Sequence, residues 1–289
     1  MANRAIALTM LVLLMLVWGT TYLSTKSVIG ETTPLMLACL RFLCASAVLV
    51  PLALMRGGLK ALPKPFPLGT LLLMTLCGYV FYFVAFNYAL VYTSAVQGAL
   101  IQALLPAAIA TAAALYLRER PSARRIAGIA LSIAGIVLVV SYGNANADAR
   151  NPLLGGILMM STVVAWAIYT VLAKRLAKAD QIVVTAFSTL SAGILMIPLA
   201  LIDSHGAPFP SLSTTAWAHI AYLGLFASGA AFVVYNLALR DLEASAVGVY
   251  MNLIPIVGMV AAVLFLGETL NPWQIVGAAV ALLGMWLSS

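Results

Sequence analysis

The sequence predicts an all-α integral membrane protein in which ten transmembrane helices form two inverted five-helix repeats. Three observations predict this class: an apolar composition, ten apolar runs of spanning length, and an internal repeat. Of the 289 residues, 64% are hydrophobic and only 8% are charged, whereas a soluble globular domain carries about 25% charged residues. So few charges cannot cover a water-facing surface, and we therefore expect the chain to lie in a lipid bilayer.

The apolar runs define the predicted helices, because a spanning helix needs about 20 mainly apolar residues. The ten runs are Arg4–Ser27, Pro34–Met55, Leu68–Val91, Ser94–Leu117, Arg124–Tyr142, Leu153–Lys174, Gln181–Ile202, Thr215–Leu239, Ser245–Leu266 and Pro272–Leu287. The stretch from Leu68 to Leu117 is uncharged and too long for one helix, and we expect its break at Tyr92-Thr93-Ser94. No small-residue cleavage site follows the first run, so we interpret it as a retained helix rather than a signal peptide.

The basic residues favour one side of the membrane. Only Lys26 and Arg150 lie in one set of loops, whereas twelve of the fifteen lysines and arginines lie in the other. These twelve are Arg4, Arg56, Lys60, Lys64, Arg118, Arg120, Arg124, Arg125, Lys174, Arg175, Lys178 and Arg240. Because basic loops remain in the cytoplasm, we expect both termini on the cytoplasmic side. The net charge of +7 then reflects topology rather than a surface for nucleic acid.

An internal repeat divides the chain into two halves. Spacings of 13, 9 and 7 residues occur twice, in the frames Pro106, Glu119, Gly128, Gly135 and Pro255, Glu268, Gly277, Gly284. Trp18 and Lys26 likewise match Trp166 and Lys174. We predict one five-helix repeat over residues 1–145 and another over residues 151–289. Because five is odd, the second repeat enters the membrane from the opposite side, as is typical of secondary transporters.

With these features the chain resembles the drug/metabolite transporter superfamily, and within it the ten-helix EamA-type exporters. Trp18-Gly19, Arg41-Phe42, Glu119 and Gly267-Glu268 carry the resemblance, which extends over essentially the whole chain. The chain looks most similar to YddG-type exporters of aromatic and other amino acids. This resemblance implies a central cavity lined by the first four helices of each repeat, with the fifth helices at the periphery.

The resemblance also implies a function. We expect a secondary transporter of the bacterial inner membrane that exports amino acids of broad range, and related small metabolites, by alternating access. Export of drugs or other metabolites, or a channel-like facilitator, remains the alternative.

Polar and aromatic side chains of the predicted helices are candidates for the cavity wall. An amphipathic cavity suits a substrate with a polar head and an apolar or aromatic body. The candidates are Trp18, Tyr22, Tyr79, Tyr82, Phe83, Asn87, Gln102, Trp166, Tyr169, Tyr235 and Asn252. Tyr79 and Tyr82 are three residues apart and would share one face of an α-helix. For the aromatic residues, the alternative interpretation is a belt at the membrane interface.

Prolines and charges inside the helices form a second group. Pro106 and Pro255 lie near the middle of their helices, where proline removes a backbone donor, so each is either a hinge or a fixed kink. Arg41 is the only charged residue well inside an apolar run. Such a charge could meet a substrate carboxylate or pair with a helix end. We interpret Arg41 as structural, together with Glu119 and Glu268.

The sequence gives little support to an enzyme. His205 and His219 are the only histidines, the three cysteines lie in apolar runs without metal-type spacing, and no Walker motif is present. We expect no cofactor and no metal. The expected partners are the lipid bilayer and small-molecule amino acids, without nucleic acid, for a monomer or alternatively a dimer. Since all eight acidic residues lie in or near loops, we expect facilitated efflux or exchange rather than an intramembrane proton relay.

Overall fold

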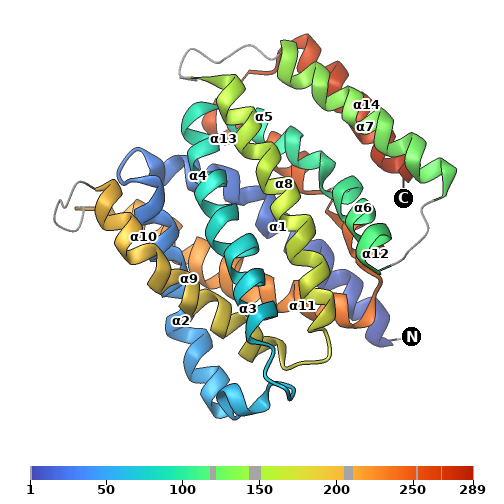
Figure 1. The fold of residues 1–289 in the computed structure, drawn as a ribbon. Coiled ribbons are helices and arrows are strands. Elements are labelled where there is room, and N and C mark those ends of the chain that lie inside the picture. The colour runs from blue at the N-terminus through green and yellow to red at the C-terminus, as the bar shows by residue number, and fades with distance from the viewer. Residues whose placement is uncertain are drawn as a thin grey trace.

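The computed structural model describes residues 2–117, 122–142, 151–204, 211–251, 253–267 and 269–288. Throughout these residues the regular structure is helical, which confirms the predicted all-α class (Figure 1). The elements are α1 (Ala2–Ile29), α2 (Pro34–Met55), η1 (Gly58–Ala61), α3 (Leu68–Thr75), η2 (Leu76–Phe81), α4 (Tyr82–Tyr92), α5 (Ala95–Ile101), η3 (Gln102–Leu104), α6 (Leu105–Leu117), α7 (Ala123–Tyr142), α8 (Pro152–Arg175), α9 (Gln181–Asp203), α10 (Thr214–Ala221), η4 (Tyr222–Ala230), α11 (Ala231–Asp241), α12 (Ala244–Tyr250), α13 (Leu253–Leu266) and α14 (Pro272–Ser288).

Seven helical segments of the described chain are long and apolar enough to cross a membrane. They are Thr9–Ile29, Pro34–Met55, Leu68–Tyr92, Ala95–Tyr116, Pro152–Arg175, Gln181–Asp203 and Thr214–Asp241. The apolar helices Ile126–Gly135, Leu253–Leu266 and Pro272–Gly284 are shorter. They correspond to the predicted fifth, ninth and tenth spans, of which the ninth is divided between α12 and α13. The chain is a multi-pass membrane protein, and large apolar side chains such as Leu13 and Ile202 are exposed on its surface, as lipid contact requires.

The break expected at Tyr92-Thr93-Ser94 is confirmed, with Tyr92 as the last residue of the preceding helix. α4 ends at Tyr92 and α5 begins at Ala95. The Ser94 hydroxyl accepts a hydrogen bond from the Gln97 N–H at 3.0 Å and so caps the N-terminus of α5. One charge-free stretch therefore forms two helical paths joined by a very tight turn.

Four helical paths are interrupted along their length. η2 joins α3 to α4 and η4 joins α10 to α11 through π-helical turns, whereas η3 is a 3-10 turn between α5 and α6. The fourth path changes from α12 to α13 after Met251. Pro106 and Pro255 follow the last two interruptions closely, and a proline cannot donate the hydrogen bond that a continuous helix requires.

α7 and α14 lie together at one edge of the bundle (Figure 1). Glycine permits their close approach. A Cβ atom at Gly135 would overlap the backbone of Gly277 and Ala281, and one at Gly284 would overlap Ser132. The Ser132 hydroxyl also donates to the Ala281 carbonyl at 3.1 Å. The small residues of these two helices therefore serve packing within the chain.

α2 packs along α9, and polar contacts tie both ends of this pair. At one end Arg56 and Asp180 form an ion pair at 3.2 Å. At the other end Asp203 accepts hydrogen bonds from the Tyr88 hydroxyl at 2.6 Å and from the Leu35 N–H at 3.3 Å. The two helices therefore run antiparallel. At each end of the pair, polar contacts join segments that are far apart in the sequence.

The contact between α7 and α14 generates the first prediction. Gly135→Ala should destabilise the protein by about 1–3 kcal/mol, because the added methyl group meets backbone that cannot rotate away. Gly69→Ala is the matched control, since a Cβ atom there has no neighbour within 4 Å and alanine favours the helix. Thermal unfolding in detergent micelles measures both. Equal melting temperatures for the two variants would contradict the packing described.

Candidate functional site

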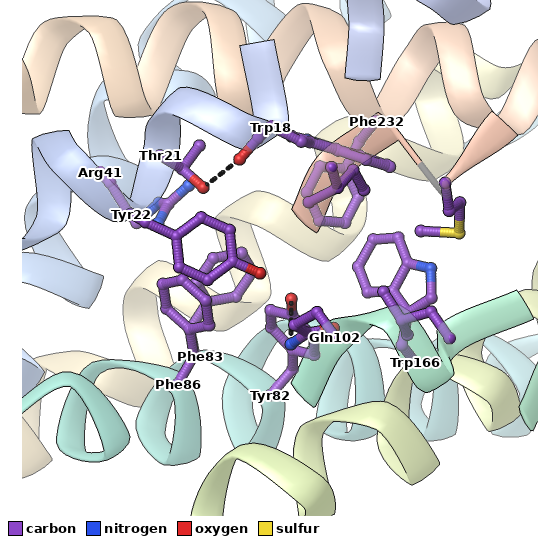
Figure 2. Close-up of a pocket in the computed structure, with 13 residues that line it drawn as sticks. Trp18, Thr21, Tyr22, Arg41, Tyr82, Phe83, Phe86, Gln102, Trp166 and Phe232 are labelled. Carbon is purple, nitrogen blue, oxygen red and sulfur yellow. Dashed lines mark hydrogen bonds between the residues drawn. The ribbon is translucent and has the colours of Figure 1, made fainter. Parts of the chain in front are cut away.

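The interior of the bundle holds a cavity with a volume of about 40 Å³. Residues from both halves of the chain line it (Figure 2): Trp18, Thr21, Tyr22, Arg41, Tyr82, Phe83, Phe86, Gln102, Leu105, Trp166, Phe232, Met251 and Ile254. Pockets that hold drug-sized ligands typically measure roughly 300–1,000 Å³. A small metabolite could enter this cavity only if its walls moved apart.

Six of the residues predicted for the wall lie on it: Trp18, Tyr22, Tyr82, Phe83, Gln102 and Trp166. Asn252 lies outside the described residues, as do Glu119 and Glu268. Most of the wall residues that the sequence did not single out are apolar, such as Phe232 and Ile254. A buried leucine, isoleucine or methionine carries no sequence signal that separates a cavity wall from an ordinary core.

An aromatic shell surrounds much of the cavity. The ring centroids of Trp18 and Trp166 are 5.2 Å apart, with their planes at 86°, and Phe232 packs edge-on against both at 5.8 and 5.4 Å. Tyr82 lies 5.1 Å from Trp166. The indole N–H of Trp18 donates to the Ala227 carbonyl of η4 at 3.0 Å. These contacts hold α1, α4, α8 and α11 together around the cavity.

Gln102 supplies a polar group to the wall from η3. Its Nε2 donates to the Thr162 hydroxyl at 2.7 Å and to the Tyr82 hydroxyl at 3.3 Å. Its Oε1 is buried and has no hydrogen-bond partner among the described residues. Since a buried acceptor without a donor is costly, this oxygen is available to a donor group that enters the cavity.

Arg41 also lies on the wall, although the sequence favoured a purely structural role. Its side chain is buried, its Nε donates to the Ser228 hydroxyl at 2.8 Å, and its Nη2 lies 3.5 Å from the Leu223 carbonyl. The guanidinium carbon lies 4.2 Å from the centre of the Phe83 ring, which gives a cation–π contact. The signal for this position was its isolation as a charge within an apolar run.

Tyr79, Tyr169 and Tyr235 are fully buried beside the cavity rather than on its wall. The Tyr169 hydroxyl donates to Asn236 Oδ1 at 2.9 Å, and the hydroxyls of Tyr235 and Thr170 are 2.7 Å apart. We call these five residues the packed layer. The hydroxyls of Tyr169 and Tyr235 are satisfied by these contacts without a ligand, whereas the Tyr79 hydroxyl is buried and has no hydrogen-bond partner among the described residues.

The remaining predicted residues also lie off the wall. The Asn87 amide donates to the Pro34 carbonyl at 2.8 Å and so joins α4 to the start of α2. Pro106 lies in the first turn of α6, next to the wall residue Leu105, and Pro255 is buried in the first turn of α13, next to Ile254. Among the described residues, no group of three His, Cys, Asp or Glu side chains is placed to hold a metal ion.

Comparison with known proteins identifies relatives of the whole chain. The model of the EamA-like transporter family matches residues 5–141 and again residues 153–289. An uncharacterized transporter of Archaeoglobus fulgidus is 30% identical over 281 residues, which cover 97% of this chain and 96% of that protein.

Two further matches concern function and fold. A probable terminal-alkyne amino-acid exporter of Streptantibioticus cattleyicolor is 28% identical over 206 residues, 71% of this chain and 68% of that protein. A solved structure, described only as the crystal structure of a protein, superimposes with a TM-score of 0.75 at 23% identity and covers 99% of this chain and 98% of its own. That structure bears on the fold alone.

Polar residues of the wall and of the packed layer should differ in how much each contributes to the free energy of unfolding. Gln102→Leu should change the free energy of unfolding by less than about 1 kcal/mol, because hydrogen bonds between membrane helices contribute little and an unpaired acceptor is removed. Asn236→Leu should cost about 1–3 kcal/mol, because it leaves the buried Tyr169 hydroxyl without an acceptor. Thermal unfolding in detergent compares the two. If Gln102→Leu is the more damaging change, Gln102 serves the fold rather than the cavity.

Proposed function

Because this chain belongs to the EamA-like transporter family, we propose that it exports amino acids and related small metabolites by alternating access. The small aromatic cavity is the observation that carries this proposal. Trp18 and Trp166 lie on its wall and contact each other, and Gln102 and Arg41 add polar groups to the same wall. This combination fits a substrate with a polar head and an aromatic or aliphatic body. The similarity to a probable amino-acid exporter supports the same class.

The proposed architecture is a five-plus-five inverted repeat. Its first half comprises α1, α2, α3–α4, α5–α6 and α7, and its second half comprises α8, α9, α10–α11, α12–α13 and α14. Contacts between equivalent helices support it: α1 packs against α11 and α13, and α8 packs against the equivalent α4 and α6. The π-helical turns η2 and η4 also occupy equivalent paths. In such a repeat, exchange of the two halves' conformations opens the site to the other side of the membrane.

The small volume of the cavity supports a carrier that closes around its substrate. A site of about 40 Å³ must expand to admit an amino acid, and the interruptions in four helical paths are the positions at which those helices can bend. Pro106 and Pro255 are the proposed hinges, since each lies just beyond an interruption. Facilitated efflux or exchange then needs no intramembrane proton relay.

The proposed orientation places both termini in the cytoplasm and the protein in the bacterial inner membrane. The ion pair of Arg56 with Asp180 then lies at the cytoplasmic end, and the Asp203 contacts lie at the outer end. The protein acts as a monomer and uses no cofactor in this proposal. The alternative is export of drugs or other metabolites, or facilitated passage through a channel, which the same aromatic wall would permit.

Counterflow into proteoliposomes tests the proposal. Purified protein is reconstituted, the vesicles are loaded with unlabelled amino acid, and uptake of labelled phenylalanine, threonine and lysine is followed. Saturable counterflow of phenylalanine is the expected result. Tyr82→Ala should raise the half-saturating concentration of phenylalanine at least tenfold, about 1.4 kcal/mol, because it opens the aromatic shell. Tyr116→Ala is the control, since Tyr116 is 62% exposed on α6.

Each outcome has a distinct meaning. Linear uptake that no amino acid saturates would favour the channel-like alternative. Absence of uptake of every amino acid would contradict the substrate class and favour export of other metabolites. Native affinity in the Tyr82→Ala variant would place the substrate elsewhere in the protein.

A further inference from the structure

Arg41 carries a charge that the rest of the described structure does not neutralise. Its side chain is 1% exposed. The ion pairs found among the described residues join Arg56 to Asp180 and Arg240 to Asp241, and neither includes Arg41. Its hydrogen-bond acceptors are a serine hydroxyl and a backbone carbonyl, which are dipoles rather than counter-charges.

The guanidinium has bonding capacity left over. Nη1 is buried and has no hydrogen-bond partner in the described part of the chain, whereas Nε and Nη2 are directed to Ser228 and Leu223 of η4. Arg41 itself lies on the cavity wall beside Thr21 and Tyr22 (Figure 2). The free N–H groups therefore belong to a side chain that borders the one space a ligand is proposed to occupy.

A buried arginine without a counter-charge destabilises the folded protein. Its side chain remains protonated in proteins, and a buried charge without a partner of opposite sign is strongly unfavourable. The contacts with Phe83 and Ser228 reduce the cost, because a ring face and a hydroxyl dipole both attract a cation. An anion that bound beside the guanidinium would compensate the charge fully and complete its hydrogen bonds.

We propose that Arg41 is an anion-binding residue that receives the carboxylate of the transported substrate. This inference deepens the proposed function and depends on it for the identity of the cavity's ligand. A carboxylate fits better than a neutral polar group because it alone supplies the missing charge. A planar guanidinium also matches the two oxygens of a carboxylate. The aromatic rings of Tyr82 and Phe83 then border the remainder of the substrate.

The proposal separates two roles for the same residue. If Arg41 only braces α2 against η4, its replacement should lower stability without changing which ligands bind. If Arg41 binds the carboxylate, the preference for an acid over the corresponding neutral amide should depend on it. That ratio is therefore the readout that a merely structural arginine would not change.

The test measures dissociation constants by calorimetry on the purified full-length protein in detergent. The ligands are two matched pairs: L-phenylalanine with L-phenylalaninamide, and 3-phenylpropionate with 3-phenylpropionamide. Native protein should bind the acid at least tenfold more tightly than its amide. Arg41→Gln should reduce this ratio to about one, and Arg41→Lys should keep the preference with weaker binding because lysine keeps the charge. Arg240→Gln, at an exposed helix end, should leave the ratio unchanged.

The binding experiment tests the role of Arg41, whereas the transport assay tests the proposed function, so the two can fail independently. Equal binding of acid and amide by native protein, or no binding of either, would overturn the role of Arg41 even if the Arg41→Gln variant could not be purified. An unchanged ratio in a folded Arg41→Gln variant would also overturn it. Acid-selective binding without amino-acid counterflow would leave the role of Arg41 intact and contradict only the proposed function.

Discussion

A backbone polar group inside a bilayer must find its hydrogen bond within the protein, and this constraint explains where the chain departs from regular α-helix. The π-helical turns η2 and η4, the 3-10 turn η3 and the break after Met251 all occur in paths that contribute to the cavity wall. One face of each π-helical turn is buried in the protein, at Gly78 and Tyr79 of η2 and at Ala227 and Ser228 of η4. The bond from the Trp18 indole to the Ala227 carbonyl of η4 illustrates this, because a side chain of one helix satisfies the interrupted ladder of another.

The same requirement applies to the buried polar side chains, and among the described residues unsatisfied atoms occur both on the cavity wall and away from it. In the packed layer, Tyr169 and Asn236 bond to each other, so these polar atoms need nothing further. On the wall, Gln102 Oε1, Arg41 Nη1 and Trp166 Nε1 are buried and have no hydrogen-bond partner among the described residues. An unsatisfied buried polar atom costs stability, and a bound ligand is one way to satisfy it. On the wall these atoms border a cavity that both halves of the chain line, and this position is the reason for proposing the substrate site there.

The sequence alone predicts much of the fold, because a long apolar segment in a bilayer must form a helix to satisfy its backbone hydrogen bonds. It also predicts the break at Ser94 and six residues of the wall. The prediction that Tyr79 and Tyr82 both line the cavity fails for Tyr79, and the reason is physical. Residues three apart share a face in an α-helix, but Tyr79 lies in the π-helical turn η2, where a turn holds more residues. Tyr82 lies on the cavity wall and Tyr79 does not. For Arg41 the sequence favours a structural role, and no sequence pattern shows whether a neighbour neutralises its buried charge.

The central claim is that the cavity opens to one side of the membrane at a time, and distances between spin labels test it most directly. With its three cysteines replaced, the protein would carry label pairs at Thr32 and Ser211 near one end of the bundle, and at Leu59 and Lys178 near the other. Addition of phenylalanine in lipid should lengthen one distance and shorten the other. Distances that both stay constant, or that lengthen together as in an opening pore, would contradict alternating access.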